Sequence, residues 1–354
     1  MQDKNDITLA KGLCMLLVVT GHTLAGGVSI GNEWFSDTVV RLYLFHMPFF
    51  MFLSGFLYFR PGRVESIRAK YWDHAGKQAV RLLLPFFFLG IVVLVGKFAM
   101  QNIVHVDNVP ESFSSGLVKL FWETDRSPAM FIWYIYVLFF YTVLSPLIYP
   151  YFKDKFGYWI ALGLIIYFLP YVHYLYMDRI AQYFIFFVIG GAIRQNEAKY
   201  LNVIDRKYLL WTLIPVFFAI LILVPFKPYL HSPLGMLIVG LMSIPILHGL
   251  ARRIMSMGRN VSTEINPLAQ FFMTIGVYSY VIYLFNVITI GVIKGVLFKF
   301  TDWNGWHFWY FMPILIAGAI IGSILAEKLV LQHLPFIRNN ILGRSDKQHA
   351  IEKT

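Results

Sequence analysis

A lysine and a histidine near the N-terminus are the first residues whose types and spacing could support catalysis. Lys11 and His22 are the two ends of the stretch KGLCMLLVVTGH. In an α-helix, eleven residues rise about 16.5 Å and leave the two side chains about 20° apart around the axis. We therefore expect one helix face with a cation near one end and an imidazole near the other. A neutral imidazole can take a proton from a hydroxyl group at neutral pH, although a lone histidine could also be an interfacial residue bonded to water.

A second histidine, His46, lies in the stretch FHMPFFMFLSGF at 45–56. If this stretch runs antiparallel to the first, His46 lies at a similar depth to His22, and the two imidazoles are expected to face one pocket. Glu33 and Asp37 in the intervening segment could orient a base. An exposed acid is also commonly just solvated.

The elements that position these residues are predicted to be membrane-spanning helices. The chain has 354 residues, of which 58% are hydrophobic and 14% charged, whereas about a quarter of the residues in an ordinary globular protein are charged. A helix needs roughly 20 apolar residues to cross a bilayer. The sequence predicts an all-α integral membrane protein, a bundle of about ten such helices, at 7–29, 41–59, 82–101, 129–150, 157–176, 179–194, 208–226, 233–250, 271–298 and 307–331.

The basic residues predict the orientation of this bundle. Of the 30 lysines and arginines, 21 fall in segments that are cytoplasmic if both ends of the chain are inside, and five fall in the opposite loops. This bias favours both ends inside and explains the net charge of +11 without nucleic acid. We expect one domain over 1–354, embedded at about 7–331, with a cytoplasmic tail at 332–354. A single cysteine, Cys14, excludes an intramolecular disulfide framework and a cysteine-based zinc site, and we expect no metal.

The lysine–x10–histidine spacing, together with the stretch at 45–56, resembles the membrane-bound acyltransferase-3 family and its fucose-4-O-acetylase-like branch. Weaker similarities are Lys77 and Arg81 before the third span, Trp133-Tyr134 at the fourth, and Arg179 with FFVIG at 186–190. Two departures stand out. Asn286 occupies a position where many members carry histidine, and the Arg-x-x-Arg pair of other members is expected to be replaced here by Lys77 and Arg81.

The resemblance implies transfer of an acyl group, usually acetyl, from cytoplasmic acyl-CoA to a carbohydrate hydroxyl at the outer face of a bacterial inner membrane. Acyl-CoA would be a co-substrate, with no bound cofactor. His22 would be the catalytic base, and Lys11, Lys77 and Arg81 would bind the donor phosphates. The residues expected to contact the acceptor or the oxyanion are His46, Ser54, Trp133, Arg179, Asn286, Trp303 and Trp306.

Other interpretations remain open for several of these residues. Lys77 and Arg81 are equally explained as cytoplasmic anchors, and Trp303 and Trp306 as part of an interfacial aromatic belt. A membrane transporter or flippase for a glycan or small metabolite would line its path with Lys11, His22 and His46. An enzyme with a lipid, peptide or amine acceptor is a third alternative. No acidic residue lies in the centre of any predicted span, which favours an enzyme.

Overall fold

The computed structural model describes residues 2–24, 27–103, 106, 108–257, 266–334 and 337, and these residues form helices and connecting segments without a β-strand. The α-helices are α1 Gln2–His22, α2 Glu33–Leu42, α3 His46–Tyr58, α4 Arg63–Ala69, α5 Tyr71–Gln78, α6 Leu84–Met100, α7 Phe113–Phe121, α8 Trp133–Phe152, α9 Phe156–Phe168, α10 Met177–Gln195, α11 Glu197–Ile204, α12 Lys207–Leu223, α13 Pro233–Ser256, α14 Pro267–Val277, α15 Ser279–Leu297 and α16 Phe308–Leu329. Short turns are π-helical at Ala79–Leu83 and Phe226–Leu230, and 3-10 at Thr124–Arg126, Met130–Ile132, Gly305–His307 and Leu331–His333. The predicted all-α class is confirmed.

Each of the ten predicted spans coincides with helix, but fewer helices have the length and apolarity of a membrane crossing. In the described part of the chain, six helical segments meet both criteria: Glu33–Tyr58, Tyr71–Met100, Met130–Phe152, Pro233–Ser256, Ser279–Leu297 and Gly305–His333. A seventh is the pair α11 and α12, bent by 74°. The protein is therefore a multi-pass membrane protein, and the count of ten and the orientation remain predictions. Most of the predicted tail lies outside the described residues.

Several predicted spans have other bounds in the structure: α1 ends at His22, before residue 29, and 41–59 is divided between α2 and α3. Two further differences concern 271–298 and 157–176. The stretch 271–298 is not one helix, because α14 ends at Val277 and α15 begins at Ser279. α14 starts earlier than expected, at Pro267, where the Asn266 side chain accepts a hydrogen bond from the backbone N–H of Ala269 at 2.8 Å. This arrangement is a favourable helix start, with a capping side chain followed by proline. The second difference is α9, which has 13 residues, fewer than a perpendicular crossing needs.

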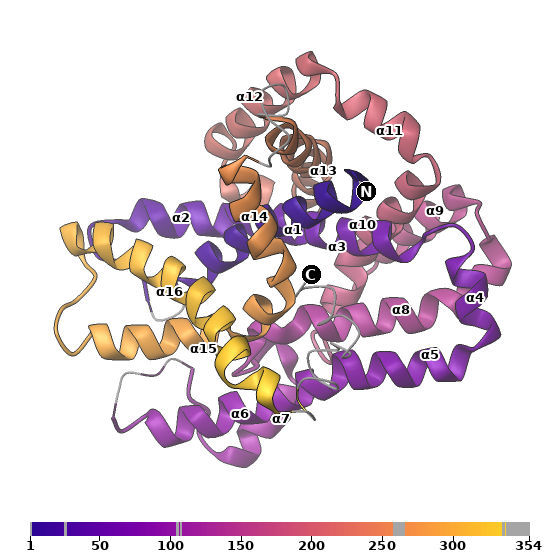
Figure 1. Cartoon of the computed structure of the whole chain (residues 1–354). Helices are drawn as coiled ribbons and strands as arrows, with labels where there is room; N and C mark the ends of the chain where they lie inside the picture. Colours follow the sequence, from indigo (N-terminus) through magenta and orange to yellow (C-terminus); the bar gives the residue numbers. More distant parts are fainter. Residues whose placement is uncertain are drawn as a thin grey trace.

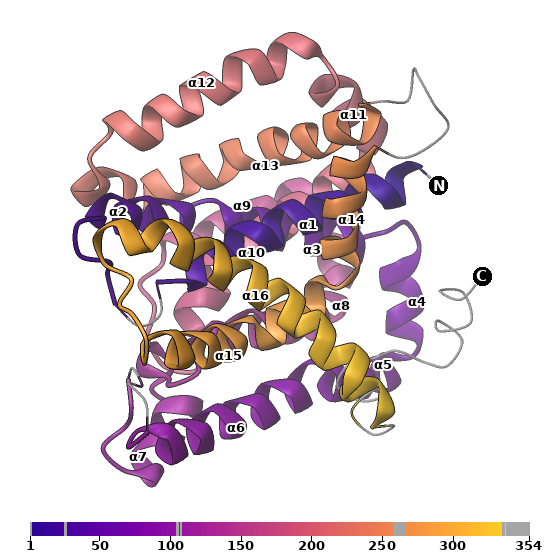
Figure 2. The same ribbon diagram turned by 60° about the vertical axis from the view of Figure 1, so that its left-hand side comes forward.

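The first helix lies at the centre of the bundle. α1 contacts α3, α13, α14, α15 and α16, and Figures 1 and 2 show it enclosed between these elements. A helix that carries Lys11 and His22 is poorly suited to face lipid, because charged and polar side chains there are costly. Its position surrounded by other helices satisfies that requirement and brings both side chains within reach of several neighbours.

Glycines allow two pairs of helices to touch backbone to backbone. A Cβ at Gly12 would lie 1.9 Å from the carbonyl oxygen of Phe272, and one at Gly276 would lie 1.9 Å from that of Thr8, so α1 and α14 are in direct contact. In the same way, a Cβ at Gly55 of α3 would lie 1.8 Å from the carbonyl oxygen of Phe187 in α10. Small residues commonly permit such close helix packing in membranes. These contacts fix the two helices that carry His22 and His46.

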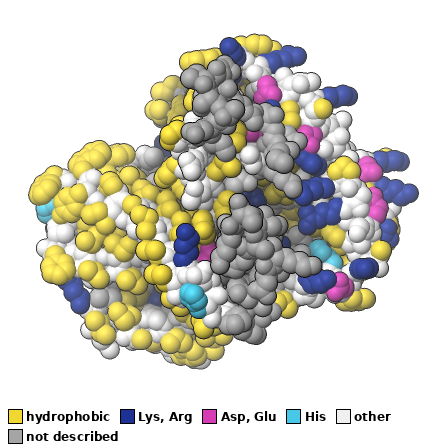
Figure 3. All heavy atoms as spheres, viewed as in Figure 1, with side chains coloured by type: hydrophobic (Ala, Val, Ile, Leu, Met, Phe, Trp, Pro, Cys, Tyr) yellow, Lys and Arg dark blue, Asp and Glu magenta, His cyan; other side chains and the backbone are white. Residues whose placement is uncertain are grey.

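The two ends of the bundle differ in charge. Figure 2 shows the start of α1 together with α4, α5 and α11 at one end, and α2, α7 and the α15–α16 connection at the other. Lysine and arginine side chains gather over α4, α5 and α11 in Figure 3, whereas the surface over α2, α15 and α16 is mainly hydrophobic. We call these the basic end and the opposite end.

We expect Gly55→Ala to destabilise the protein, because the added methyl group must displace the α10 backbone. Overpacking of this kind typically costs about 1–3 kcal/mol. Thermal unfolding in nanodiscs should show a lower Tm. Gly291→Ala in α15 is the matched control, since a Cβ at Gly291 meets nothing within 4 Å; its Tm should be unchanged or higher. Equal Tm values for the two variants would contradict the packing described.

Candidate functional site

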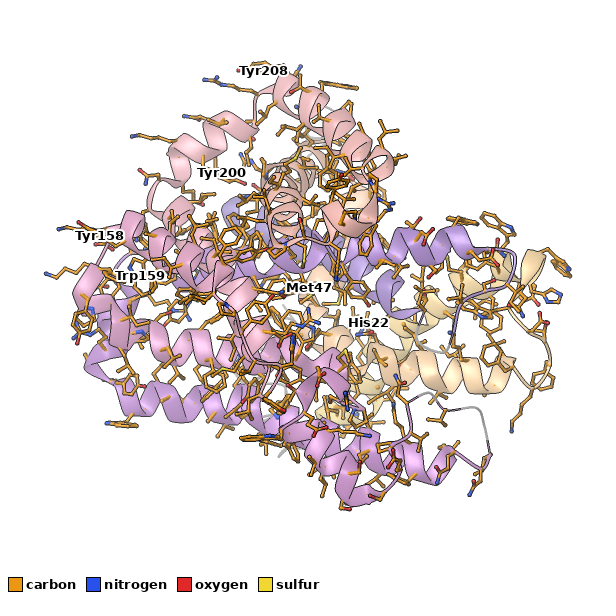
Figure 4. The ribbon with its side chains drawn as sticks, turned by 180° about the vertical axis from the view of Figure 1, so that it is seen from behind. His22, Met47, Tyr158, Trp159, Tyr200 and Tyr208 are labelled. Carbon is orange, nitrogen blue, oxygen red and sulfur yellow. The ribbon has the colours of Figure 1, made fainter. Side chains whose placement is uncertain are left out.

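The base predicted from the sequence is held by a residue on a helix far along the chain. His22 is the last residue of α1, and its Nδ1 lies 2.6 Å from Oδ1 of Asn286 in the middle of α15. Asn286 is completely buried, and its Nδ2 donates hydrogen bonds to the carbonyl oxygens of Ile282 at 2.7 Å and Tyr283 at 3.0 Å. Figure 4 shows His22 in the interior of the bundle.

These contacts determine which nitrogen of His22 carries the hydrogen. The Asn286 amide nitrogen faces two carbonyl oxygens, so it must be the donor, and Oδ1 can then only accept. His22 Nδ1 therefore donates to Asn286. In the neutral ring, Nε2 is left with its lone pair, which is the state that a general base requires.

His46 lies at the start of α3 and has the same tautomer. Its Nδ1 donates to the carbonyl oxygen of Leu42 at 2.6 Å, and its own carbonyl oxygen accepts a hydrogen bond from the Cys14 thiol at 3.1 Å. The ring packs against Tyr43, with centroids 5.0 Å apart. The adjacent residue Met47 is buried, and Figure 4 shows it in the interior of the molecule.

Three residues expected to contact an oxyanion have their hydrogens engaged within the protein. Both amide hydrogens of Asn286 and the Nδ1 hydrogen of His46 bond to backbone carbonyls, as described above. Ser54 Oγ donates to the carbonyl oxygen of Phe50 at 2.9 Å and lies 2.6 Å from the Tyr134 hydroxyl. Since the single Ser54 hydrogen is used for Phe50, the Tyr134 hydroxyl donates to Ser54.

A cavity of about 300 Å³ lies toward the basic end of the bundle. Four cationic side chains line it, Lys11, Arg60, Arg63 and Arg81, and none of the described lining residues is acidic. Mutual repulsion among four cations is relieved by an anion, so this cavity is suited to a polyanionic ligand. Arg81 reaches it from the π-helical turn between α5 and α6, and turns of this kind are frequent at functional sites.

The lining residues at the other side of this cavity include Ser54, Tyr134 and Tyr283. Tyr283 donates its hydroxyl hydrogen to the carbonyl oxygen of Phe131 at 2.7 Å, and its own carbonyl oxygen accepts from Asn286. The described lining does not include His22 or His46. Within the described residues, Tyr283 therefore connects the cavity lining to the His22–Asn286 pair through its carbonyl oxygen.

The predicted residues at the opposite end form two separate groups. Arg179 lies over the Trp133 ring, 5.6 Å from its centroid, and Trp133 packs against Tyr183 with centroids 4.8 Å apart. Trp303 is only 3% exposed and is covered by Lys294 at 4.1 Å. Trp306 is 72% exposed.

Comparison with known proteins decides the family. Residues 4–328 match the model of the family described as "Acyltransferase domain", acyltransferase-3. The chain belongs to the acyltransferase-3 family. It is similar to the nodulation protein NolL of Sinorhizobium fredii, with 32% identity over 149 residues, which are 40% of this chain and 37% of that protein. It is also similar to the nodulation protein NolL of Mesorhizobium japonicum, with 37% identity over 81 residues, 22% of this chain and 21% of that protein.

These alignments span well under half the length of both curated relatives. No solved structure matches the chain. The family match covers nearly the whole chain and identifies a membrane acyltransferase.

The structure draws attention to an arginine pair that the sequence analysis missed. Arg60-Pro-Gly-Arg63 has the Arg-x-x-Arg spacing attributed above to other family members, and both arginines line the basic cavity beside Arg81. The spacing itself was the available signal. Lys77, in contrast, is not among the lining residues; it forms a 2.7 Å ion pair with Asp73 and is 73% exposed.

Tyr43 is a second residue that sequence analysis missed. A Cβ at Gly21, next to His22, would lie 3.4 Å from the Tyr43 hydroxyl oxygen. This phenol is therefore close to the end of α1 that carries His22, and its ring packs against that of His46. No pattern in the sequence distinguished it from the other 20 tyrosines.

We expect Asn286→Leu to lower kcat for acyl transfer at least about tenfold, because the His22 ring loses the partner that fixes its tautomer. Asn286→His, the residue of many family members, restores a hydrogen-bond acceptor and should keep most of the activity. Steady-state rates of acyl transfer by the purified variants test this. A leucine variant as active as the histidine variant would show that the hydrogen bond has no catalytic role.

Proposed function

We propose that the protein transfers an acetyl group from acetyl-CoA to a hydroxyl group of a cell-surface or exported carbohydrate. The observation that carries the proposal is the His22–Asn286 hydrogen bond, which leaves His22 Nε2 as a proton acceptor on the same helix as a cation of the basic cavity. The protein would lie in the bacterial inner membrane, with its basic end facing the cytoplasm. This orientation agrees with the excess of lysine and arginine at that end.

The donor is assigned to the basic cavity by its charge. Coenzyme A carries several phosphate charges on its nucleotide, and guanidinium groups are well suited to bind phosphate. Lys11, Arg60, Arg63 and Arg81 would hold this part of the donor. The pantetheine arm, a thin chain, would extend along α1 past the tyrosines, over the roughly 16.5 Å of helix rise between Lys11 and His22.

The transfer needs one group that first accepts a proton and then donates it. His22 Nε2 takes the hydroxyl proton of the acceptor as its oxygen attacks the thioester carbonyl carbon. The C–O bond forms, the C–S bond breaks, and the proton on His22 passes to the departing thiolate to give coenzyme A. The Tyr43 hydroxyl, close to Gly21, is the proposed donor to the oxyanion.

The acceptor is assigned to the opposite end. Trp133 offers aromatic surface and Arg179 a charged donor group, the kinds of side chain that bind sugars by stacking and hydrogen bonds. Tyr183 is itself buried and packs against the Trp133 ring. Trp306 is accessible to a longer glycan. Trp303 is assigned no contact with the acceptor because it is buried under Lys294.

Replacement of the base tests the reaction. His22→Gln preserves the size of the side chain but cannot act as a base, so transfer of labelled acetyl from acetyl-CoA to the surface glycan should fall by about 10²–10⁴. The measurement uses purified protein in nanodiscs, with Tm as the control for folding. Full transfer by this variant would exclude His22 as the base.

A second test separates the cations of the cavity from those outside it. Arg60→Gln and Lys11→Gln should raise the KM for acetyl-CoA roughly tenfold, since charge-assisted hydrogen bonds contribute about 1.5–3 kcal/mol. The matched control is Lys77→Gln, another exposed cation at the same end, which should leave that KM unchanged. A uniform response of the three variants would indicate a diffuse electrostatic effect and no defined phosphate site.

A further inference from the structure

His46 presents a buried nitrogen with no partner in the described protein. The residue is 1% exposed, its Nδ1 hydrogen is engaged by the carbonyl oxygen of Leu42, and Nε2 has no hydrogen-bond partner among the described residues. In the neutral ring, Nε2 is a bare acceptor. An unsatisfied buried polar group costs about 1–3 kcal/mol, so this position calls for a donor from a ligand.

The neighbouring contacts place His46 beside the catalytic base. α1 and α3 are antiparallel here, because Gly21 lies against Tyr43 whereas Cys14, earlier on α1, bonds to His46. Side chains on a helix lean toward its N-terminus. His22 therefore leans back along α1, while His46 leans along α3 in the opposite direction, so both side chains lean toward the same level of the bundle.

The site thus contains two imidazole Nε2 atoms, one of His22 and one of His46, and each carries a lone pair that can accept a hydrogen bond. One is sufficient to accept the proton of the reacting hydroxyl. A neutral His46 with its hydrogen on Nδ1 cannot donate from Nε2 to an oxyanion, so its role is to accept a hydrogen bond from the substrate. A carbohydrate has several hydroxyl groups, so a second hydroxyl of the proposed acceptor can donate this hydrogen bond to His46.

Resting on the proposed function, we propose that the acceptor is a vicinal diol: the hydroxyl that reacts is bound at His22, and the hydroxyl on the adjacent carbon donates to His46 Nε2. His46 is then a binding residue that selects polyhydroxylated acceptors over simple alcohols. His46 also determines which hydroxyl lies at His22. Only a sugar whose neighbouring hydroxyl has the correct orientation can bond to Nε2 of both histidines.

Competition by small alcohols tests this proposal without knowledge of the natural sugar. Purified protein in nanodiscs is given labelled acetyl-CoA and de-O-acetylated surface glycan from the source cells, and transfer is inhibited with cis-1,2-cyclohexanediol, trans-1,2-cyclohexanediol or cyclohexanol. The better diol should have an inhibition constant about fivefold lower than that of cyclohexanol, as expected for one neutral hydrogen bond of about 1 kcal/mol. In His46→Phe this ratio should fall to about one, with the KM for acetyl-CoA unchanged.

His46→Gln keeps an acceptor oxygen and should retain part of the diol preference, which separates hydrogen bonding from packing. Equal inhibition by diols and cyclohexanol in the unaltered protein overturns the proposal, and that comparison requires no variant. So does a diol preference that survives in His46→Phe. A raised KM for acetyl-CoA in His46→Phe would instead assign Nε2 to an amide of the donor arm. Absence of any acetyl-CoA-dependent transfer to the glycan is a different result, since it contradicts the proposed function itself.

Discussion

A polar side chain enclosed by membrane-spanning helices must find its partner inside the protein, because neither lipid nor bulk water can supply one. The hydrogen bond between His22 and Asn286 meets this requirement and determines much of the site. It joins the end of α1 to the middle of α15, residues 264 positions apart. The two bonds from Asn286 to the α15 backbone prevent the amide from turning over, so the direction of the bond to His22 is fixed as well.

The same requirement accounts for the position of α1. Its polar residues would be unfavourable at the surface of the bundle, and glycines allow α14 to lie directly against it at Gly12 and Gly276. Lys11 is next to this contact and faces the basic cavity. The helix that carries the candidate chemistry is therefore also the helix around which the others pack.

The fold class and the positions of most helices could be predicted from the sequence, because apolar stretches of sufficient length report directly on helices in lipid. The break at Tyr278 could not, since the close contact of α14 with α1 at Gly276 is a matter of tertiary geometry. Within the candidate site, the spacing of Lys11 and His22 correctly predicted that one helix carries both. The partner of His22 was identified as an unusual residue, but its contact required the fold. Arg60 and Arg63 differ in that their spacing is visible in the sequence. The family resemblance instead predicted a role for Lys77, which forms an ion pair with Asp73 one helical turn away.

The straight segment of α1 between Lys11 and His22 has a consequence for substrate choice under the proposed function. The distance along this helix matches the length of the pantetheine arm of the donor, which is the same for every acyl-CoA. It therefore does not depend on the length of the acyl chain beyond the thioester. Discrimination between short and long acyl chains must therefore depend on the residues around the imidazole, among them Phe131, whose ring stands edge-on to His22 with centroids 6.4 Å apart. A change in the volume of the side chain at 131 would thus alter the acyl group that fits beside His22 without altering the binding of coenzyme A.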